Sequence, residues 1–415
     1  MVGEHVSGST SRWLAALQAK LDERRKESSL RALRPLAGAC QTVVRLDSGD
    51  AVNFSSNDYL GLANHPALIE ATAASVRRYG VGAGASPLVT GFHQLHQALA
   101  ARLATMTGRE SVLLLGSGFS ANKLLLQTLA TKNDVIFQDR LNHASLIDGA
   151  RYSEASLLRY KHLDCEDLQR LLQAKGASAA TGRNFIVSDS VFSMDGDIAP
   201  ASQMAELARD NNGVLMLDDA HGFGVLGEAG GGIAEEAGLD QAKLPILMGT
   251  LRKALGGYGA FIAGSATLID TLINFGRSYI YSTATPPALA ASTLAAIDLL
   301  QAEPERRQRL FENIAYFKRG LAALGIPHSN SRTPVQAVML GDNERALRWQ
   351  HALQLQGFLV VAIRPPTVPA NTARLRIALS AAHSRNQIEG LLAAMAKLSG
   401  DQGDHELRSS PAQSC

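Results

Sequence analysis

Residues 245–263 read PILMGTLRKALGGYGAFIA, and the expected fold follows first from this segment. An apolar segment, a polar turn, a glycine cluster and a second apolar segment follow one another, which predicts two strands joined by a tight connection. Lys253 lies in the turn, with apolar residues on both sides. Burial disfavours the charged form of a lysine, and an amine with a lowered pKa can form a Schiff base with a carbonyl compound. A lysine on an exposed loop is the alternative that this stretch leaves open.

A second strand end lies upstream, at Asp218. Residues 214–217 are apolar, which predicts a buried strand with Asp218 at its C-terminal end. Ligands of open α/β sheets bind at such strand ends, and a carboxylate there can pair with a pyridinium nitrogen. His221 follows closely and could hydrogen-bond a ring oxygen; a helix cap at Asp218 and a structural loop histidine are the alternatives. The segment from Asp218 to Lys253 is long enough for one crossover connection to a neighbouring strand. The Asp218 carboxylate and the Lys253 amine would then lie at neighbouring strand ends, as a pyridoxal 5'-phosphate (PLP) site needs.

The composition limits the class of protein. The chain has 415 residues, which allows two or three domains, and its 46% hydrophobic and 19% charged residues are ordinary for a globular protein with a large core. A net charge of +2 indicates neither a nucleic-acid nor a membrane partner, and no apolar run is long enough to span a membrane. The three scattered cysteines give neither a metal-ligand spacing nor a disulfide framework, so we expect no metal and a cytoplasmic location. The first ten residues lack the apolar core of a signal peptide.

Three further strand ends carry groups suited to a flat, phosphorylated ligand. Residues 112–115 form an apolar strand that runs into a turn of small residues and a helix. The free N–H groups at such a helix start suit a phosphate, although an ordinary strand-to-helix turn fits the pattern as well. His143 follows the strand 134–138, where an imidazole can lie on the face of a flat cofactor or be a structural loop histidine. Ser193 follows the strand 185–189 and could donate a hydrogen bond to the cofactor.

Arginines near both ends of the chain are candidates for binding a substrate anion. Residues 11–33 have apolar residues at helical spacing, with Arg31 near the end of the predicted helix. The strand 373–379 carries Arg374 and Arg376 on the same side, and one of them could hold a carboxylate in bidentate fashion. A solvated arginine at position 31 and a pair of edge-strand arginines are the alternatives.

The order of these elements predicts an α/β fold with four parts. An N-terminal helix and arm (1–50) precede a large cofactor-binding domain built on a mixed sheet (51–290), and a smaller α+β domain follows (291–400). The polar tail (401–415) is expected to be disordered.

Several segments together resemble the α-oxoamine synthases, which are PLP enzymes of the aspartate-aminotransferase fold (fold type I). The resemblance covers roughly residues 12–398. It is carried by several separate motifs in the same order as in the family, which makes it specific. The motifs are residues 53–62, 118–119, 139–145, 191–196 and 218–222, with Thr250 and Lys253 in the lysine turn.

The resemblance implies a role for each residue around the cofactor. Lys253 would carry the covalent link to the cofactor aldehyde, and Asp218 would pair with the pyridine nitrogen. His221 and Ser193 would contact the region of the ring oxygen, and His143 would stack on the ring and contact the substrate. The remaining cofactor contacts would come from Gly118, Phe119 and Thr250.

The resemblance also implies substrate and subunit contacts. Arg31 and Thr367 match positions that contact substrate, and Arg376 matches the arginine that holds the amino-acid carboxylate. The family forms homodimers with the sites at the subunit interface, and Ser282 and Thr283 resemble residues that reach the phosphate in the neighbouring subunit.

Within the family, residues 362–370 and 372–376 point to one activity. It is the decarboxylative condensation of L-alanine with a pimeloyl thioester, carried on coenzyme A or on acyl carrier protein, in biotin biosynthesis. The alternatives are a family member that uses glycine or another acyl donor, and a PLP-binding protein without catalytic activity.

Overall fold

The computed structural model describes residues 8–26, 30–47, 49–175, 182–365 and 367–400. In that part of the chain the strands form three sheets, and the largest has seven strands in the order β3-β9-β8-β7-β6-β4-β5. Strand β9 runs antiparallel to β3 and β8, and the other neighbours are parallel. The strands are β3 (Ser111–Leu115), β4 (Val135–Asp139), β5 (Ser156–Tyr160), β6 (Asn184–Asp189), β7 (Gly213–Asp218), β8 (Ile246–Thr250) and β9 (Ala260–Gly264).

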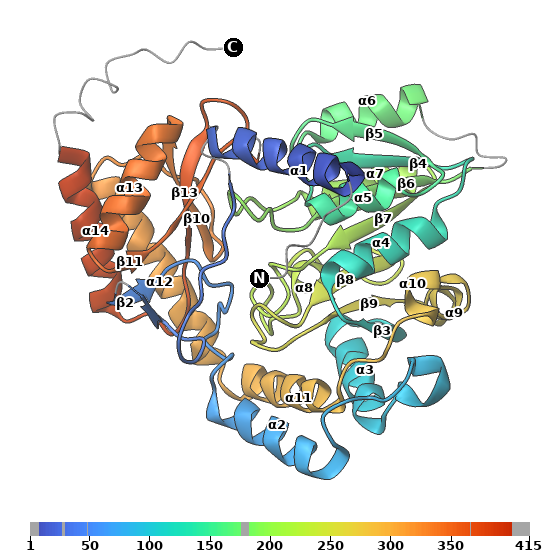
Figure 1. Cartoon of the computed structure of the whole chain (residues 1–415). Helices are drawn as coiled ribbons and strands as arrows, with labels where there is room; N and C mark the ends of the chain where they lie inside the picture. Colours follow the sequence, from blue (N-terminus) through green and yellow to red (C-terminus); the bar gives the residue numbers. More distant parts are fainter. Residues whose placement is uncertain (1–7, 27–29, 48, 176–181, 366, 401–415) are drawn as a thin grey trace.

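Helices cover both faces of this sheet because its strands are apolar on both sides (Figure 1). Successive residues of β7 alternate between two cores: Leu215 and Leu217 belong to one, and Met216 belongs to the other. Such strands need cover on each face. One face carries α4 (Gly118–Leu129), α5 (Ala144–Arg151), α9 (Ala266–Phe275) and α10 (Arg277–Ile280). The other carries α3 (Gln94–Thr107), α6 (Cys165–Lys175), α7 (Ala201–Asp210), α8 (Ile233–Glu236) and α11 (Pro287–Ala302), with α2 (Pro66–Tyr79) packed on α11.

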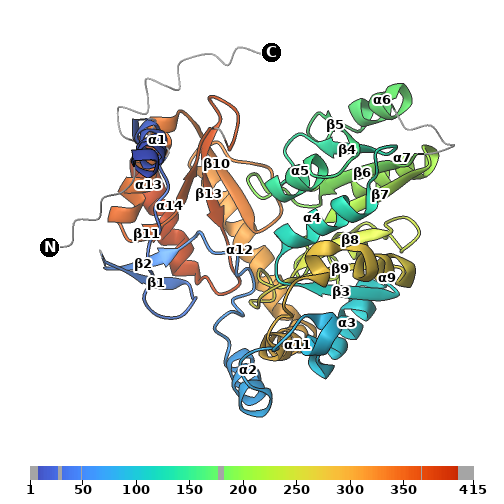
Figure 2. The same ribbon diagram turned by 45° about the vertical axis from the view of Figure 1, so that its right-hand side comes forward.

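A second, C-terminal layer lies beside the large sheet in both ribbon views (Figures 1 and 2). Its antiparallel sheet has the order β10-β13-β12, and a small sheet β1-β2-β11 adjoins it. The strands are β1 (Val43–Leu46), β2 (Gly49–Asn53), β10 (Val335–Gly341), β11 (Phe358–Leu359), β12 (Val361–Ile363) and β13 (Ala373–Ala378). The helices are α12 (Pro304–Ala323), α13 (Asn343–Leu355) and α14 (Arg385–Gly400); α1 (Gly8–Lys26) and the short π-helix η1 (Pro87–Gly91) complete the elements.

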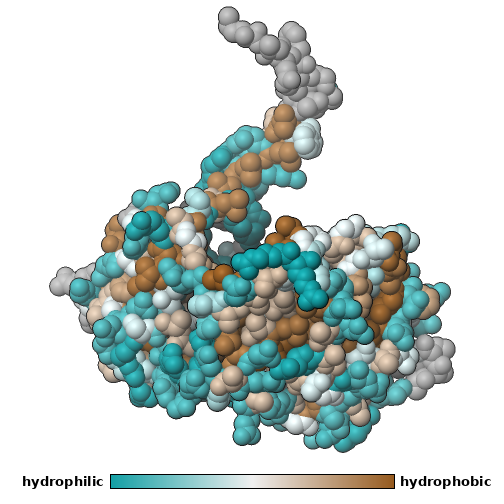
Figure 3. All heavy atoms as spheres, turned by 90° about the horizontal axis from the view of Figure 1, so that it is seen from below, coloured by the Kyte–Doolittle hydropathy of each residue, from teal (hydrophilic) through white to brown (hydrophobic). Residues whose placement is uncertain are grey.

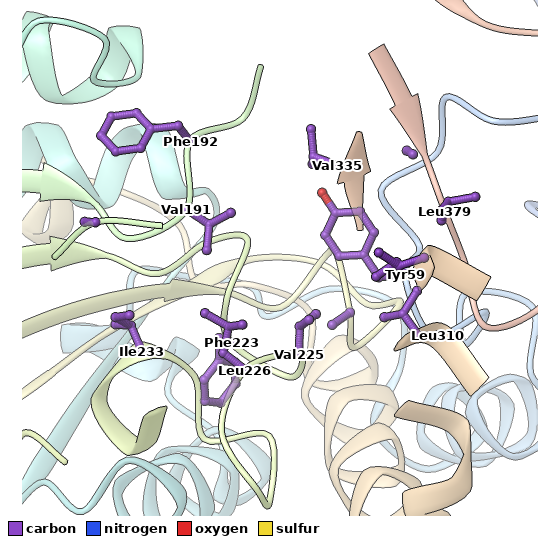
Figure 4. Close-up of a cluster of buried hydrophobic side chains, with 14 of the residues drawn as sticks. Tyr59, Val191, Phe192, Phe223, Val225, Leu226, Ile233, Leu310, Val335 and Leu379 are labelled. Carbon is purple, nitrogen blue, oxygen red and sulfur yellow. The ribbon is translucent and has the colours of Figure 1, made fainter. Parts of the chain in front are cut away.

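One apolar core joins the two layers. Figure 4 shows Tyr59 between Val335 and Leu379 of the C-terminal layer, facing Val191 and Val225 of the large sheet's loops. All five side chains are buried and belong to the same cluster. The layers are therefore held in a defined relation, and the space between them can form a shaped site.

The predicted fold class is confirmed by this mixed seven-stranded α/β sheet with a smaller C-terminal α+β layer. The four-part division stays a prediction, although β2, which crosses the expected boundary at residue 51, pairs with β11 on the C-terminal side. The expected tail, 401–415, lies outside the described residues. Within the described chain no helix is both long and apolar enough to cross a membrane.

Two segments are shorter or more divided than their apolar residues suggest. Residues 358–363 are an apolar run, but the run divides at Val360 because β11 pairs with β2 whereas β12 pairs with β13. The N-terminal helix was expected to cover residues 11–33, but α1 ends at Lys26. Apolar spacing overestimates both runs, since it cannot show where a chain leaves one sheet for another or where a helix ends.

Candidate active site

A cavity of about 320 Å³ lies where the strand ends of the large sheet meet the C-terminal layer. It brings together nine of the predicted site residues: Gly118, Phe119, His143, Ser193, Asp218, His221, Thr250, Lys253 and Arg376. The other lining residues are Ser55, Asn57, Ser145, Asp189, Met194, Ala220, Met248, Arg252, Val361 and Ile363. Arg31 and Thr367 are exposed and do not line this cavity, so their substrate contacts stay predictions.

Lys253 is 7% exposed and sits in the tight turn that follows β8. The backbone N–H of Gly256 donates to the Lys253 carbonyl at 3.0 Å. Gly256 has φ +61°, and a Cβ atom there would lie 2.4 Å from the nitrogen of Ala63, so only glycine fits the turn without strain. Burial lowers the pKa of Lys253 to about 7, although the Asp218 and Asp189 carboxylates partly oppose this effect. A large fraction of the amine is therefore neutral near neutral pH and able to attack an aldehyde.

Asp218 is the last residue of β7 and is 4% exposed. Its Oδ2 accepts from Asn122 Nδ2 at 2.6 Å, and its Oδ1 accepts from the Ala220 N–H at 2.9 Å. The next residue, Asp219, points elsewhere, because its carboxylate accepts from Ser190 and from the Ile233 N–H at 2.8 Å. Alternation along the strand end thus directs Asp218, and not Asp219, to the cavity.

His221 is 8% exposed, and its Nδ1 lies 2.6 Å from the Tyr59 hydroxyl. Burial lowers the pKa of His221 well below its usual value, and the nearby Lys253 and Arg376 charges add to the effect. The ring is therefore neutral, and it offers one N–H or one lone pair to a ligand.

His143 caps the start of α5 and lines the cavity. Its backbone N–H donates to Asp189 Oδ2 at 2.6 Å, and its Nδ1 lies 2.7 Å from Ser145 Oγ. Burial lowers the pKa of His143, with the Asp218 carboxylate acting in the opposite direction. Burial also raises the pKa of Asp189 well above its usual value, and the neighbouring Asp218 reinforces this rise.

The structure separates the two arginines of β13. Arg376 lines the cavity, and its Nε donates to the Ser193 carbonyl at 2.5 Å while its Nη2 donates to Asn57 Oδ1 at 3.1 Å. Arg374 is instead bound to Asp195 and to the Thr372 carbonyl, at 2.8 Å from Nε. Arg376 is therefore the arginine that can reach a ligand carboxylate, and Arg374 is structural.

The strand-to-helix turn expected before α4 is present, and its use as an anion site stays a prediction. Ser117 caps the helix by accepting from the Ser120 N–H at 3.1 Å, and Gly118 and Phe119 line the cavity. A Cβ atom at Gly118 would lie 2.9 Å from Thr250 Cγ2, which explains the need for glycine. The free N–H groups of this first turn can bind a phosphate.

These groups fit PLP. A buried amine with a lowered pKa suits the aldehyde, a strand-end carboxylate suits the ring nitrogen, and a capped helix start suits the phosphate. Among the described residues no cluster of histidine, cysteine or acidic side chains could hold a metal ion.

Sequence reasoning missed six residues around the cavity. Asp189 ends an apolar strand just as Asp218 does, so the strand-end signal could have found it. Ser55, Asn57 and Tyr59 lie in a turn-rich segment, and their contacts to Leu359, Arg376 and His221 join residues far apart in the sequence. No local pattern marks Asn122 or Ser145 as site residues.

The fold and the cavity are those of PLP-dependent enzymes with the class I and II aminotransferase fold. The family model described as aminotransferase class I and II matches residues 49–395 of the chain. Two curated relatives named 8-amino-7-oxononanoate synthase are similar over most of their length. The one from Chromohalobacter salexigens is 48% identical over 387 residues (93% of this chain and 97% of the relative). The one from Methylococcus capsulatus is 51% identical over 355 residues (86% and 91%). The chain therefore belongs to the 8-amino-7-oxononanoate synthase family, and its cofactor is PLP.

Solved structures agree with this assignment. A serine palmitoyltransferase from S. paucimobilis superposes with a TM-score of 0.85 at 26% identity (92% of this chain and 96% of that chain). An 8-amino-7-oxononanoate synthase from Francisella tularensis gives a TM-score of 0.73 at 29% identity (86% and 99%). The resemblance to PLP-dependent acyltransferases that the motifs indicate is confirmed.

Proposed function

We propose that the chain condenses L-alanine with a pimeloyl thioester, with loss of carbon dioxide and release of the thiol, to give 8-amino-7-oxononanoate in biotin biosynthesis. The observation that carries the proposal is the buried Lys253 amine, with its pKa lowered to about 7, and the Asp218 carboxylate in one cavity. The chain is 46–51% identical to synthases of that name.

Each residue has a task in holding the cofactor. Lys253 would bind the aldehyde carbon, and Asp218 would accept a hydrogen bond from the protonated ring nitrogen. The first turn of α4, at Gly118 and Phe119, would bind the phosphate together with Thr250. Within the cavity, His221 and Ser193 suit the ring oxygen and His143 suits the ring face. When bound, PLP supplies an electron sink for negative charge at the amino-acid α-carbon.

Lys253 is the group proposed to move the proton. Its Nζ would take the proton from the alanine α-carbon, because a group with a pKa of about 7 can accept and return a proton at neutral pH. Arg376 would bind the alanine carboxylate and so fix the direction of the α-carbon–hydrogen bond, which is the bond that must be broken first. Water exclusion by the two layers would strengthen both interactions.

The acting unit is proposed to be a homodimer located in the cytoplasm. Large apolar side chains remain exposed on the single chain, among them Val81 (76%), Val89 (74%), Phe275 (72%) and Tyr281 (74%). Figure 3, the view from below, shows hydrophobic residues (brown) among hydrophilic ones on this face of the molecule. A second copy could cover such a surface, and it would bring Ser282 and Thr283, which follow Tyr281, toward the neighbouring site.

The test is a steady-state assay of the PLP-loaded protein with L-alanine or glycine against pimeloyl or acetyl thioesters. The proposal predicts turnover with alanine and a pimeloyl thioester, with coenzyme A and acyl carrier protein donors run side by side. A clear preference for glycine, or for a short acyl group, would reject it in favour of another activity of the α-oxoamine synthase type. A protein that binds PLP but turns over none of the pairs would support the non-catalytic alternative.

A further inference from the structure

A chain of buried hydrogen bonds connects His143 with Asp218 through two residues outside the proposed mechanism. Ser145 Oγ lies 2.7 Å from His143 Nδ1, Asn122 Nδ2 lies 2.9 Å from Ser145 Oγ, and the same Nδ2 lies 2.6 Å from Asp218 Oδ2. Asn122 is 0% exposed, Ser145 1% and Asp218 4%. The chain therefore runs through an interior in which each donor must find an acceptor.

The direction of each bond follows from the groups present. Asn122 must turn its NH₂ group toward Asp218, because the amide oxygen at that distance would face a carboxylate. The second N–H of Asn122 then donates to Ser145 Oγ, and the single hydroxyl hydrogen of Ser145 is left for His143 Nδ1. The Ser145 backbone N–H, which can only donate, also points to His143 Nδ1, at 3.2 Å.

Two donors therefore converge on His143 Nδ1, so this nitrogen carries no proton. A neutral imidazole has one N–H, which must then be at Nε2. Since Nδ1 faces Ser145, Nε2 is the nitrogen left for the cavity that His143 lines. It would present a hydrogen-bond donor there, suited to an oxygen of the substrate.

We propose that Asn122 and Ser145 are positioning residues, which hold His143 as the Nε2–H tautomer and hold the Asp218 carboxylate in its orientation. This inference rests on the proposed function for the roles of His143 and Asp218. A second observation supports it: Asn122 Oδ1 is buried and has no hydrogen-bond partner among the described residues. An unpaired buried acceptor such as this amide oxygen lowers the stability of the folded protein, and an apolar side chain at position 122 would avoid that loss. The hydrogen bonds that the Asn122 NH₂ group donates to Asp218 and Ser145 explain why an amide is present there.

The direct test is nuclear magnetic resonance of the cofactor-free protein with nitrogen-15 histidine, with the His143 signals identified by their loss in His143→Gln. The proposal predicts an unprotonated Nδ1 and a protonated Nε2 in the wild-type protein. A proton on Nδ1 would overturn it, whatever the activity of the enzyme.

Two variants test the positioning role in the PLP-loaded enzyme. Ser145→Ala should mix the two tautomers and lower kcat for alanine roughly tenfold or more, with the KM of the thioester little changed. Asn122→Ala should raise the Kd of PLP roughly tenfold, because Asp218 loses its side-chain donor. The control is Ser75→Ala, another buried serine, on α2, whose hydroxyl has no partner in the described structure.

The outcomes separate this inference from the proposed function. If the wild-type enzyme shows no turnover of alanine with a pimeloyl thioester, the proposed function fails, while the tautomer and the PLP affinity still decide the positioning role. If both variants keep the wild-type tautomer, Kd and kcat, Asn122 and Ser145 are ordinary core residues. If either variant fails to fold, the wild-type tautomer still decides.

Discussion

The burial of Lys253 predicts a pH-dependent stability that the variant Lys253→Met should remove. Burial lowers the pKa of this amine from 10.5 to about 7 in the folded protein, whereas the unfolded chain keeps the ordinary value. Between these two values the unfolded state binds one proton more than the folded state, so the free energy of unfolding rises with pH. Below pH 7 both states are protonated, and the folded state carries the whole cost of the buried charge.

The size of the effect follows from the same two values. Between pH 7 and pH 10.5, each pH unit raises the free energy of unfolding by about 1.4 kcal/mol. The rise from pH 7 to pH 9 is therefore about 2–3 kcal/mol. The full penalty, below pH 7, is about 5 kcal/mol for a lysine that is 7% exposed. Methionine has a similar length and no charge, so Lys253→Met should be more stable than the wild-type protein at pH 7 and should lose most of this advantage toward pH 10.

The assay is urea unfolding of cofactor-free protein at fixed concentration, at pH 6, 7, 8 and 9, for the wild type and Lys253→Met. Lys243→Met, at an exposed lysine, is the control and should show no pH-dependent difference. A stability difference between Lys253→Met and the wild type that stays constant from pH 7 to pH 9 would show that burial does not lower the pKa of Lys253 to about 7. The amine would then be charged in the folded protein and unsuited to attack an aldehyde at neutral pH.

Three further changes have expected outcomes. Burial disfavours the charged form of His162, but hydrogen bonds to Asp139 and Asp197 outweigh this effect and raise the pKa of His162 to about 9. The stabilisation by these bonds is complete below pH 6.5 and is lost as pH rises through 9. Because the side chain is 24% exposed, His162→Gln should lower the free energy of unfolding by only about 1–2 kcal/mol at pH 6 and by almost nothing at pH 10. Urea unfolding at both pH values measures this, and an equal loss at both would contradict it. Arg376→Lys should raise the KM for alanine about 10- to 100-fold while leaving the KM for the thioester nearly unchanged. If steady-state kinetics give an unchanged KM for alanine, Arg376 does not bind the alanine carboxylate. Gly256→Ala should lower the free energy of unfolding by about 1–3 kcal/mol, because φ is positive and the added carbon meets backbone; an unchanged Tm would show that the turn adapts.

Much of the site could be predicted because parallel strands bring their C-terminal ends to one edge of a sheet. That rule made Asp218, His221, His143 and Ser193 candidates for one site, the glycine-rich turn after a further strand added Lys253, and the family resemblance gave each of them a role. The large sheet was predictable for a related reason: its strands are continuous apolar runs.

The remaining features depend on contacts between distant segments. Nothing local to Arg374 and Arg376 says which one meets Asp195, because the answer lies in how the 191–198 loop packs on β13. Similarly, Tyr59 reaches His221 only after the N-terminal segment has folded between the two layers. The division of residues 358–363 at Val360 depends on two different partner strands. A periodic pattern records which side of an element is apolar, but it does not record the partner.

Borohydride reduction of the PLP-loaded protein, followed by peptide mass mapping, identifies the lysine that binds the cofactor. Reduction should fix one phosphopyridoxyl group per chain on Lys253, and prior addition of L-alanine should prevent the labelling by occupying the cofactor. A label on any other lysine, or a PLP-loaded protein in which Lys253 stays unmodified, would show that Lys253 is not the lysine that binds PLP.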